Sequence, residues 1–229
     1  MINYLKLPFN FDVAKMQEEL HLLDRDEWKL HFQKLHYEGD WSALPLRSVN
    51  GEADNIFVLD HHNPEFRDTA LLEKCEYFKQ ILSSFKCPLK VVRLMKLNAG
   101  AVIKEHRDME LNYENGEVRF HVPVVTHADV EFYLDNERIF LNEGECWYMN
   151  FNLPHRIVNN STVNRVHLVI DATVNDWVHD LFSKDNDQKK ETADQEEDET
   201  TKRQMIKLFR EMNTETSNRL ADDLEKSLQ

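Results

Sequence analysis

The stretch LKVVRLMKLNAGAVIKEHRD, residues 89–108, decides the fold, because β-branched and apolar residues begin here to recur at the two-residue spacing of a β-strand. Similar short runs continue to residue 172, separated by turn signals such as Asn115-Gly116 and Asn142-Glu143-Gly144. The pattern predicts strands over residues 89–98, 101–107, 117–126, 129–134, 137–141, 145–150, 155–158 and 164–172. The gaps are too short for crossover helices, so the strands should pair antiparallel in two sheets.

Helical spacing dominates the residues before these strands. Apolar residues recur at three- and four-residue steps over 13–23 and again over 70–82, before the stop at Pro88. The first half is therefore predicted to be mainly helical, with a Gly- and Pro-punctuated segment over 37–47 between the helices. The predicted fold is α+β and mainly β: a double-stranded β-helix, or cupin-like jelly roll, with N-terminal helices packed on it and a C-terminal helical tail.

The composition divides the chain into a domain and an appendage. Residues 1–183 are predicted to form one domain, which is an ordinary size for a single core. Residues 184–201 are rich in Asp and Glu and poor in apolar side chains, so they are predicted to be a flexible acidic linker. Residues 202–229 again show helical spacing and are predicted to form one or two amphipathic helices. These could fold back on the barrel, or contact a partner or a second copy of the chain.

The charge and the cysteines exclude several classes of partner. The 229 residues carry 42 acidic and 28 basic side chains, a net charge of −14, which disfavours binding to nucleic acid or to an anionic membrane surface. No run reaches the roughly 18 apolar residues of a spanning helix. The three cysteines show no CxxC spacing and nothing N-terminal resembles a secretion signal, so we expect a cytoplasmic protein.

A His-x-Asp pair at the end of the second strand is the strongest chemical signal. Residues i and i+2 of a strand share a face, so His106 and Asp108 can direct an imidazole and a carboxylate toward one point. His155, at the start of a later strand, is the candidate third ligand. Two imidazoles and one carboxylate form the facial triad of non-haem Fe(II) oxygenases. The rival pairs are 36–38, outside the predicted barrel, and 127–129, at a predicted turn.

Arg165 is the candidate anchor for a diacid co-substrate. If the turn at 159–162 joins a hairpin centred near Ser161, His155 pairs opposite His167 and Arg165 becomes its diagonal neighbour on the same face. Arg165 also opens a strongly apolar strand, where exposure is not expected. A guanidinium there could grip a carboxylate whose other end chelates the metal. The alternative is that Arg165 forms a salt bridge on the surface and has no role in binding.

Two of the predicted strands carry further polar residues on one face. Arg119 and His121 alternate with apolar residues, and His167 and Asp171 share parity with Arg165. Aromatic residues at 147 and 148 could line the cavity or fill the core, and core filling is the better expectation for both.

These motifs resemble the aspartyl/asparaginyl β-hydroxylase family of Fe(II)- and 2-oxoglutarate-dependent dioxygenases, whose bacterial branch includes free-proline hydroxylases. The resemblance runs from about residue 37 to 182 and is most specific over VVRLMKLNAGAVIKEHRD (91–108), RFHVP (119–123), LPH (153–155) and RVHLVID (165–171). It implies that the iron ligands are His106, Asp108 and His155. It implies four co-substrate contacts: Arg165 at the distal carboxylate, with Arg119, His121 and Trp41.

Two positions depart from the animal protein-modifying hydroxylases of that family. Those enzymes lack the carboxylate ligand, whereas Asp108 is present here, as in the bacterial branch. Met95 stands where they have a serine that contacts 2-oxoglutarate, so that contact is missing or replaced.

The resemblance implies an oxidoreductase that uses Fe(II), 2-oxoglutarate and O2. Such an enzyme hydroxylates an aliphatic carbon of an amino acid, free or within a peptide and of the aspartyl/asparaginyl or prolyl type, and releases succinate and CO2. Basic side chains at 93, 107 or 119 could pair with the carboxylate of that substrate. The alternative is a non-catalytic, cupin-like protein that binds a metal or a small molecule, and the ligand set beside Arg165 argues against it.

Overall fold

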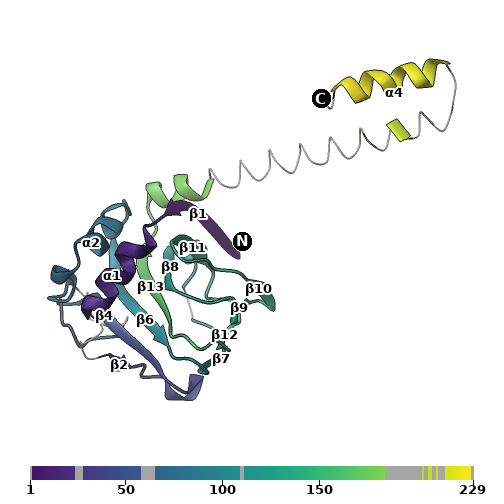
Figure 1. Cartoon of the computed structure of the whole chain (residues 1–229). Coiled ribbons are helices and arrows are strands. Elements are labelled where there is room, and N and C mark those ends of the chain that lie inside the picture. The colour runs from purple at the N-terminus through teal and green to yellow at the C-terminus, as the bar shows by residue number, and fades with distance from the viewer. Residues whose placement is uncertain are drawn as a thin grey trace. The chain divides into compact units, whose positions relative to one another are not determined.

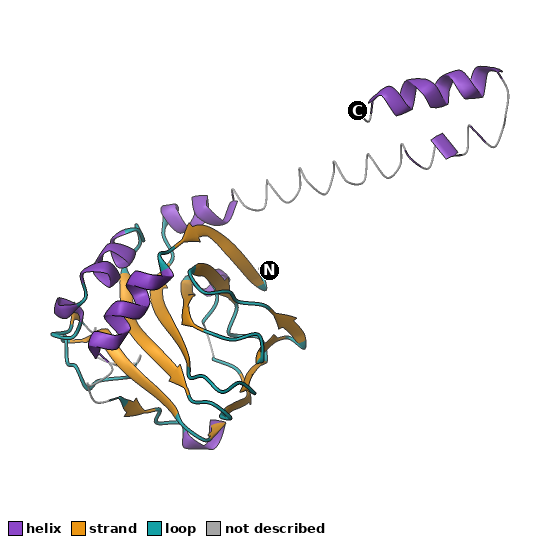
Figure 2. Cartoon of the chain, in the orientation of Figure 1, coloured by secondary structure: helices purple, strands orange, loops and turns teal. Residues whose placement is uncertain are grey.

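The computed structural model describes residues 2–23, 28–57, 65–108 and 111–183, and after these residues 203, 206–207, 210 and 215–227. The chain divides into two compact units, Met1–Asp180 and Leu181–Gln229. The first unit holds two antiparallel sheets and the helices α1 and α2 (Figures 1 and 2), so the mainly-β prediction is confirmed.

The larger sheet has eight strands among the described residues. Its strands are β1 (Tyr4–Asn10), β2 (Lys29–Leu30), β4 (Trp41–Val49), β5 (Phe66–Asp68), β6 (Leu89–Leu97), β8 (Glu117–Val125), β11 (Glu145–Met149) and β13 (Arg165–Thr173). They lie in the order β1-β11-β8-β13-β6-β4-β2, and β5 pairs with β4.

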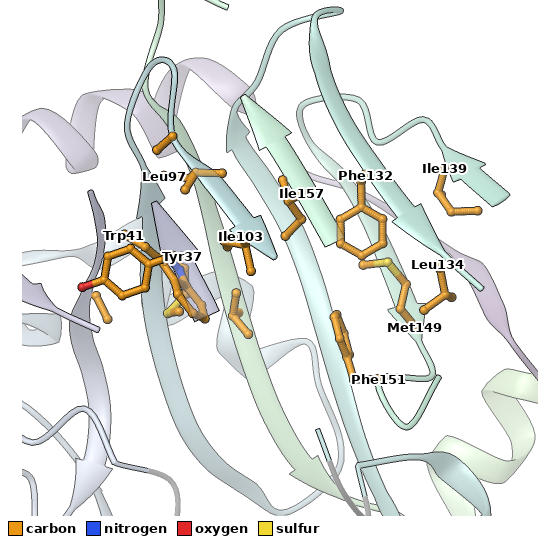
Figure 3. Packing of buried hydrophobic residues seen from close by; sticks show 14 of the residues in the cluster. Tyr37, Trp41, Leu97, Ile103, Phe132, Leu134, Ile139, Met149, Phe151 and Ile157 are labelled. Carbon is orange, nitrogen blue, oxygen red and sulfur yellow. The ribbon is translucent and has the colours of Figure 1, made fainter. Parts of the chain in front are cut away.

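The smaller sheet completes the jelly roll. Its strands are β3 (Tyr37–Glu38), β7 (Val102–His106), β9 (Val130–Leu134), β10 (Glu137–Ile139) and β12 (His155–Asn159). They lie in the order β10-β9-β12-β7-β3. Figure 3 shows the buried cluster that both sheets share, with Phe132 and Ile157 from the smaller sheet and Met149 from the larger one. The core therefore lies between the two sheets.

The strands predicted from residue 89 onward are confirmed, but the mainly helical first half is wrong. The helices α1 (Val13–Leu23) and α2 (Glu76–Ser83) are present, together with the short 3-10 turns η1 (Lys34–His36), η2 (Leu72–Lys74) and η3 (Tyr113–Asn115). The strands β1 and β4 were missed. Strand β4 is buried at nearly every position, so its sequence shows no alternation. Pro45 lies where its register with β6 shifts, a position at which a sheet tolerates proline.

The helices α1 and α2 are joined by a buried carboxylate. Glu19 of α1 accepts hydrogen bonds from the backbone N–H groups of Tyr77 and Phe78, at 2.5 and 2.8 Å. These donors lie in the first turn of α2, where backbone N–H groups have no partner within the helix. Cys75, which precedes α2, provides no side-chain cap. Glu19 therefore takes the capping role from the neighbouring helix.

The second unit contains the helix α4 (Glu215–Ser227). Residues 176–183, which span the boundary between the units, are helical as well. The predicted acidic linker, 184–201, lies outside the described residues. Within the described part of the chain, no helix is both long and apolar enough to cross a bilayer.

Asn159 fixes the crossing from the smaller sheet to the larger one, between β12 and β13. It is fully buried, and its Nδ2 group donates to the carbonyl oxygens of Leu97, Asn98 and Val163 at 3.1, 3.1 and 2.9 Å. Its Oδ1 atom accepts from the backbone N–H and the hydroxyl of Ser161 at 3.2 and 2.6 Å. One side chain of the smaller sheet thus satisfies backbone groups of β6 and of the adjoining loops.

We predict that Asn159→Ala lowers the free energy of unfolding by about 3 kcal/mol, because several buried partners lose their hydrogen bonds at once. Urea unfolding followed by circular dichroism measures the change. The matched control is Asn160→Ala, in which the side chain is exposed and the expected change lies within about 0.5 kcal/mol. Equal effects of the two substitutions would contradict the role given to Asn159.

Candidate metal centre

Two histidines face each other across the pairing of β7 and β12. His106 ends β7, His155 begins β12, and the two residues are direct partners in the antiparallel register. Their ring centroids lie 4.2 Å apart. Opposed residues of neighbouring strands point to the same face of the sheet, so the register alone brings both imidazoles together.

Hydrogen bonds fix which nitrogen each ring presents. The Nδ1 atom of His106 lies 2.7 Å from the carbonyl oxygen of Lys104, and that of His155 lies 3.1 Å from the carbonyl oxygen of Leu153. A carbonyl oxygen can only accept, so each Nδ1 must carry the proton. Each Nε2 therefore keeps its lone pair, the state required of a metal ligand. Burial also lowers the pKa of His155 to about 4, which keeps that ring neutral near pH 7.

Asp108 brings a carboxylate to the same point. Its backbone N–H donates to the carbonyl oxygen of Phe151 at 2.9 Å, which holds it beside the loop that precedes β12. Its Oδ1 atom lies 3.8 Å from Nε2 of His106. Burial alone would raise the pKa of this carboxyl, but Arg119 and the two histidines outweigh burial and lower it. Asp108 is therefore ionised at neutral pH.

The three candidate ligand atoms converge. One atom each of His106, Asp108 and His155 lies within 4.8 Å of the others. Two neutral imidazoles and one ionised carboxylate match the donor set of a non-haem Fe(II) centre. The residues fit the metal that the sequence suggests, in donor type, protonation and spacing.

Asp108 is the first member of a row of side chains with alternating charge, which continues through Arg119 and Asp171 to Arg93. Arg119 donates from Nη1 to Oδ2 of Asp108 at 2.6 Å, and from Nε and Nη2 to the two oxygens of Asp171 at 2.5 and 3.0 Å. Arg93 donates to Oδ2 of Asp171 at 3.2 Å. Burial lowers the pKa of Arg93 to about 10 although Asp171 opposes the shift, whereas the two carboxylates raise that of Arg119 above its usual value despite burial.

Arg165 is buried in the interior, 2% exposed, so the surface alternative is wrong. Its Nη2 donates to Nδ1 of His167 at 2.8 Å, so the proton of that imidazole sits on Nε2. Among the described residues Arg165 has no carboxylate partner, and its Nε and the Nε2 of His167 are buried without a hydrogen bond. Burial lowers the pKa of Arg165 to about 9 and that of His167 well below its usual value.

A cavity of about 350 Å³ opens beside this arginine. It is lined by Thr126, His127, Ala128, Val130, Phe132, Ile139, Phe140, Leu141, Asn142, Glu143, Arg165 and His167. The unpartnered N–H groups of Arg165 and His167 are hydrogen-bond donors without acceptors, which is the chemistry that receives a carboxylate.

The hairpin register that linked His155 to Arg165 is wrong. Strands β12 and β13 lie in different sheets, and Arg165 pairs with Leu97 of β6. His155 pairs with His106 instead of His167. The segment held by Asn159 crosses between the sheets, whereas the prediction assumed a tight turn within one sheet.

Among the described residues, neither rival His-x-acid pair belongs to a cluster of three candidate metal ligands. His127 and Asp129 make an exposed contact of 3.4 Å, as expected for a turn. Glu38 instead pairs with Lys104 on the surface at 2.8 Å. The prediction that the pair 36–38 lies outside the barrel is wrong, because Glu38 belongs to β3 of the smaller sheet. The ring of His36 also lies 5.1 Å from that of His106.

An aromatic wall borders the metal centre, and sequence reasoning found only part of it. Trp41 is buried and its ring centroid lies 6.4 Å from that of His106. His31 stacks on Trp41 at 3.6 Å and was missed. His31 lies before β3 in a stretch of sequence without clear periodicity. Only its proximity in the sequence to the segment around Trp41 could have suggested a role for it.

The other candidate residues are placed as follows. His121 is buried, and its Nδ1 lies 3.3 Å from Nδ1 of His167. Tyr148 fills the core, as expected, whereas Trp147 is half-buried and donates from Nε1 to Glu145 at 2.9 Å. Met95 is buried in the core cluster.

Comparisons with known proteins show the family to which the chain belongs. The family model described as Aspartyl/Asparaginyl beta-hydroxylase matches residues 11–174. The chain is 26% identical over 163 residues to an L-proline cis-4-hydroxylase of Rhizobium meliloti (strain 1021), covering 70% of this chain and 57% of that protein. It is 25% identical over 137 residues to L-proline cis-3-hydroxylase 2 of Streptomyces sp, covering 58% and 47%. The chain thus matches about half the length of these relatives.

One solved structure supports the fold. The epimerase SnoN, in a complex with Fe3+, alpha ketoglutarate and nogalamycin RO, superposes with a TM-score of 0.50 at 11% identity. The match covers 75% of this chain and 78% of that one. At this identity the likeness concerns the fold alone.

The buried histidines predict how stability depends on pH. Burial is the largest cause of the lowered pKa of His31 (about 3), His155 (about 4), His121 and His167. In the unfolded chain these histidines have a pKa of about 6.5, so below that pH they bind protons that they do not bind in the folded chain. The free energy of unfolding therefore falls as the pH drops. We expect the urea midpoint of the metal-free protein to decrease from about pH 7 to about pH 5. His127→Gln, at an exposed site, should keep the same slope, and a flat profile would contradict the analysis.

Proposed function

We propose that this chain, which belongs to the aspartyl/asparaginyl beta-hydroxylase family, is an Fe(II)- and 2-oxoglutarate-dependent dioxygenase. It would hydroxylate an aliphatic carbon of an amino acid or amino-acid residue. The observation that carries the proposal is the convergence of His106, Asp108 and His155, with both histidine tautomers set for coordination.

Iron would be held by Nε2 of His106, Nε2 of His155 and a carboxylate oxygen of Asp108. Such a ligand set leaves three positions of an octahedron for the co-substrate and O2. Bound Fe(II) supplies the oxidative chemistry that couples decarboxylation of 2-oxoglutarate to C–H hydroxylation, giving succinate and CO2. The protein contributes orientation and a dry site, because the carbonyl oxygens of Lys104 and Leu153 fix the imidazoles and the surrounding side chains are largely buried.

Arg165 would bind the distal carboxylate of 2-oxoglutarate. It is the buried guanidinium that lacks an acidic partner among the described residues, and His167 adds an unpartnered Nε2–H beside the same cavity. A buried charge without a partner is costly, so a ligand carboxylate would relieve that cost. Arg119, which the resemblance sets near the co-substrate, is engaged with Asp108 and Asp171, and its contribution there would be indirect.

The substrate is proposed to be an amino acid, with L-proline the first compound to test because both relatives described above are proline hydroxylases. The aromatic wall of His31 and Trp41 would pack against an apolar ring or side chain. The substrate carboxylate would approach Arg93, whose Nε is buried without a partner.

The protein is proposed to act in the cytoplasm. The three cysteines show no CxxC spacing, which supports an assignment to a reducing compartment. The domain limits at 183 and 201, and a contact of α4 with a partner or a second copy, stay predictions.

Anaerobic addition of Fe(II) and 2-oxoglutarate should give the weak visible charge-transfer band of the chelate, and air should then yield succinate. Substitution of a ligand, His155→Ala or Asp108→Ala, should abolish both signals, because two ligands hold the metal poorly. The matched controls His21→Ala and Asp129→Ala alter exposed side chains outside the cavity beside Arg165 and should retain both. Folded wild-type protein with neither band nor succinate would exclude the dioxygenase function and leave a binding role.

Arg165→Ala should raise the concentration of 2-oxoglutarate needed for half-maximal turnover by roughly 100-fold, the value of a lost hydrogen bond to a charged group. The maximal rate should change less, since the metal ligands are untouched. Arg165→Lys keeps the charge but loses the planar fork, so we expect an intermediate value. An unchanged requirement in the alanine variant would remove Arg165 from the co-substrate site.

A further inference from the structure

The row of buried charges beneath Asp108 is built around one guanidinium that reaches two carboxylates. Arg119 and Asp171 are direct partners in the antiparallel register of β8 and β13. Nε and Nη2 of Arg119 contact the two oxygens of Asp171 in a bidentate fork, which fixes the plane and position of the guanidinium. The remaining group, Nη1, is thereby directed at Asp108.

This contact divides the two oxygens of Asp108 between different roles. Oδ2 accepts from Arg119 at 2.6 Å, while Oδ1 faces the histidines, 3.8 Å from Nε2 of His106. A carboxylate can bind a metal through one oxygen or through both. With Oδ2 already occupied by a charged donor, Asp108 offers the metal a single oxygen.

The rest of the row makes this arrangement stable in the interior. Asp171 is 1% exposed and also accepts from Arg93, so two guanidinium groups balance the two carboxylates. The Arg119 guanidinium lies 5.4 Å from the ring centroid of Phe151, the residue whose carbonyl oxygen accepts from the backbone of Asp108. A row with balanced charges and fixed hydrogen bonds is less costly to bury than an isolated ion.

The number of oxygens that Asp108 donates decides how many positions stay open. Two imidazoles and one oxygen leave three sites of an octahedron, enough for a bidentate 2-oxo acid and O2. A second oxygen from Asp108 would occupy one of these sites and compete with 2-oxoglutarate. We propose that Arg119, held by Asp171, is a positioning residue that keeps Asp108 a one-oxygen ligand; this rests on the proposed function.

The test compares Co(II)-loaded wild type, Asp171→Asn and Arg119→Lys under anaerobic conditions. Asp171→Asn weakens the fork without touching the metal ligand, and Arg119→Lys keeps the charge but cannot hold both carboxylates. In both variants the Kd of 2-oxoglutarate for the Co(II)-loaded protein should rise by roughly 10–100-fold. The visible absorption of Co(II) before 2-oxoglutarate is added should change as well, because it reports the coordination of the metal.

The control is Arg156→Lys, which alters an arginine of β12 that pairs with Glu105 on the surface and should leave both readouts unchanged. Thermal unfolding of the metal-free variants identifies those that are folded at the temperature of measurement, and a single folded variant is sufficient for the comparison. Folded variants with the wild-type Kd and spectrum would overturn this inference alone. Wild-type protein that binds no Co(II) would overturn the proposed function together with it.

Discussion

The pairing of β7 with β12 is the constraint on which the site depends. Because His106 and His155 are opposite one another in this register, the sheet places both imidazoles on one face without any help from loops. A shift of one residue would turn one imidazole to the opposite face. The backbone carbonyl oxygens that fix the tautomers belong to Lys104 and Leu153, each two residues before its histidine, so the same segments set position and protonation together.

Charge is arranged in the interior by two different rules. Asp108, Arg119, Asp171 and Arg93 form a row in which each charge contacts one of opposite sign. Arg165 lies in the same unit with only neutral imidazole beside it among the described residues. The ion pairs of the row fix the positions of its side chains. The Arg165 guanidinium, in contrast, can still form an ion pair with a ligand carboxylate. The contrast separates residues that position the site from the one proposed to bind the co-substrate.

Much of this could be predicted from the sequence, and the failures have physical causes. Strands such as β12 alternate because one face is buried, and the His-x-Asp spacing predicted that His106 and Asp108 approach each other. Strand β4 escaped prediction because burial on both faces removes alternation and Pro45 suggests a turn. The sheet change after β12 could not be read from turn chemistry, since the contacts of Asn159 involve residues far away in the chain. His31 and His36 approach the centre only through tertiary packing.

The separation of the candidate ligands along the chain affects the order of folding and metal binding. His106 and Asp108 are two residues apart, but His155 joins them only after the segment containing β8, β9, β10 and β11 has folded. Closing such a distant contact costs chain entropy before any bond to the ion can compensate. The ion would therefore recognise chains whose barrel is already assembled, and its binding energy would add to their stability. Cellular supply of the ion would then influence how much of this protein escapes degradation.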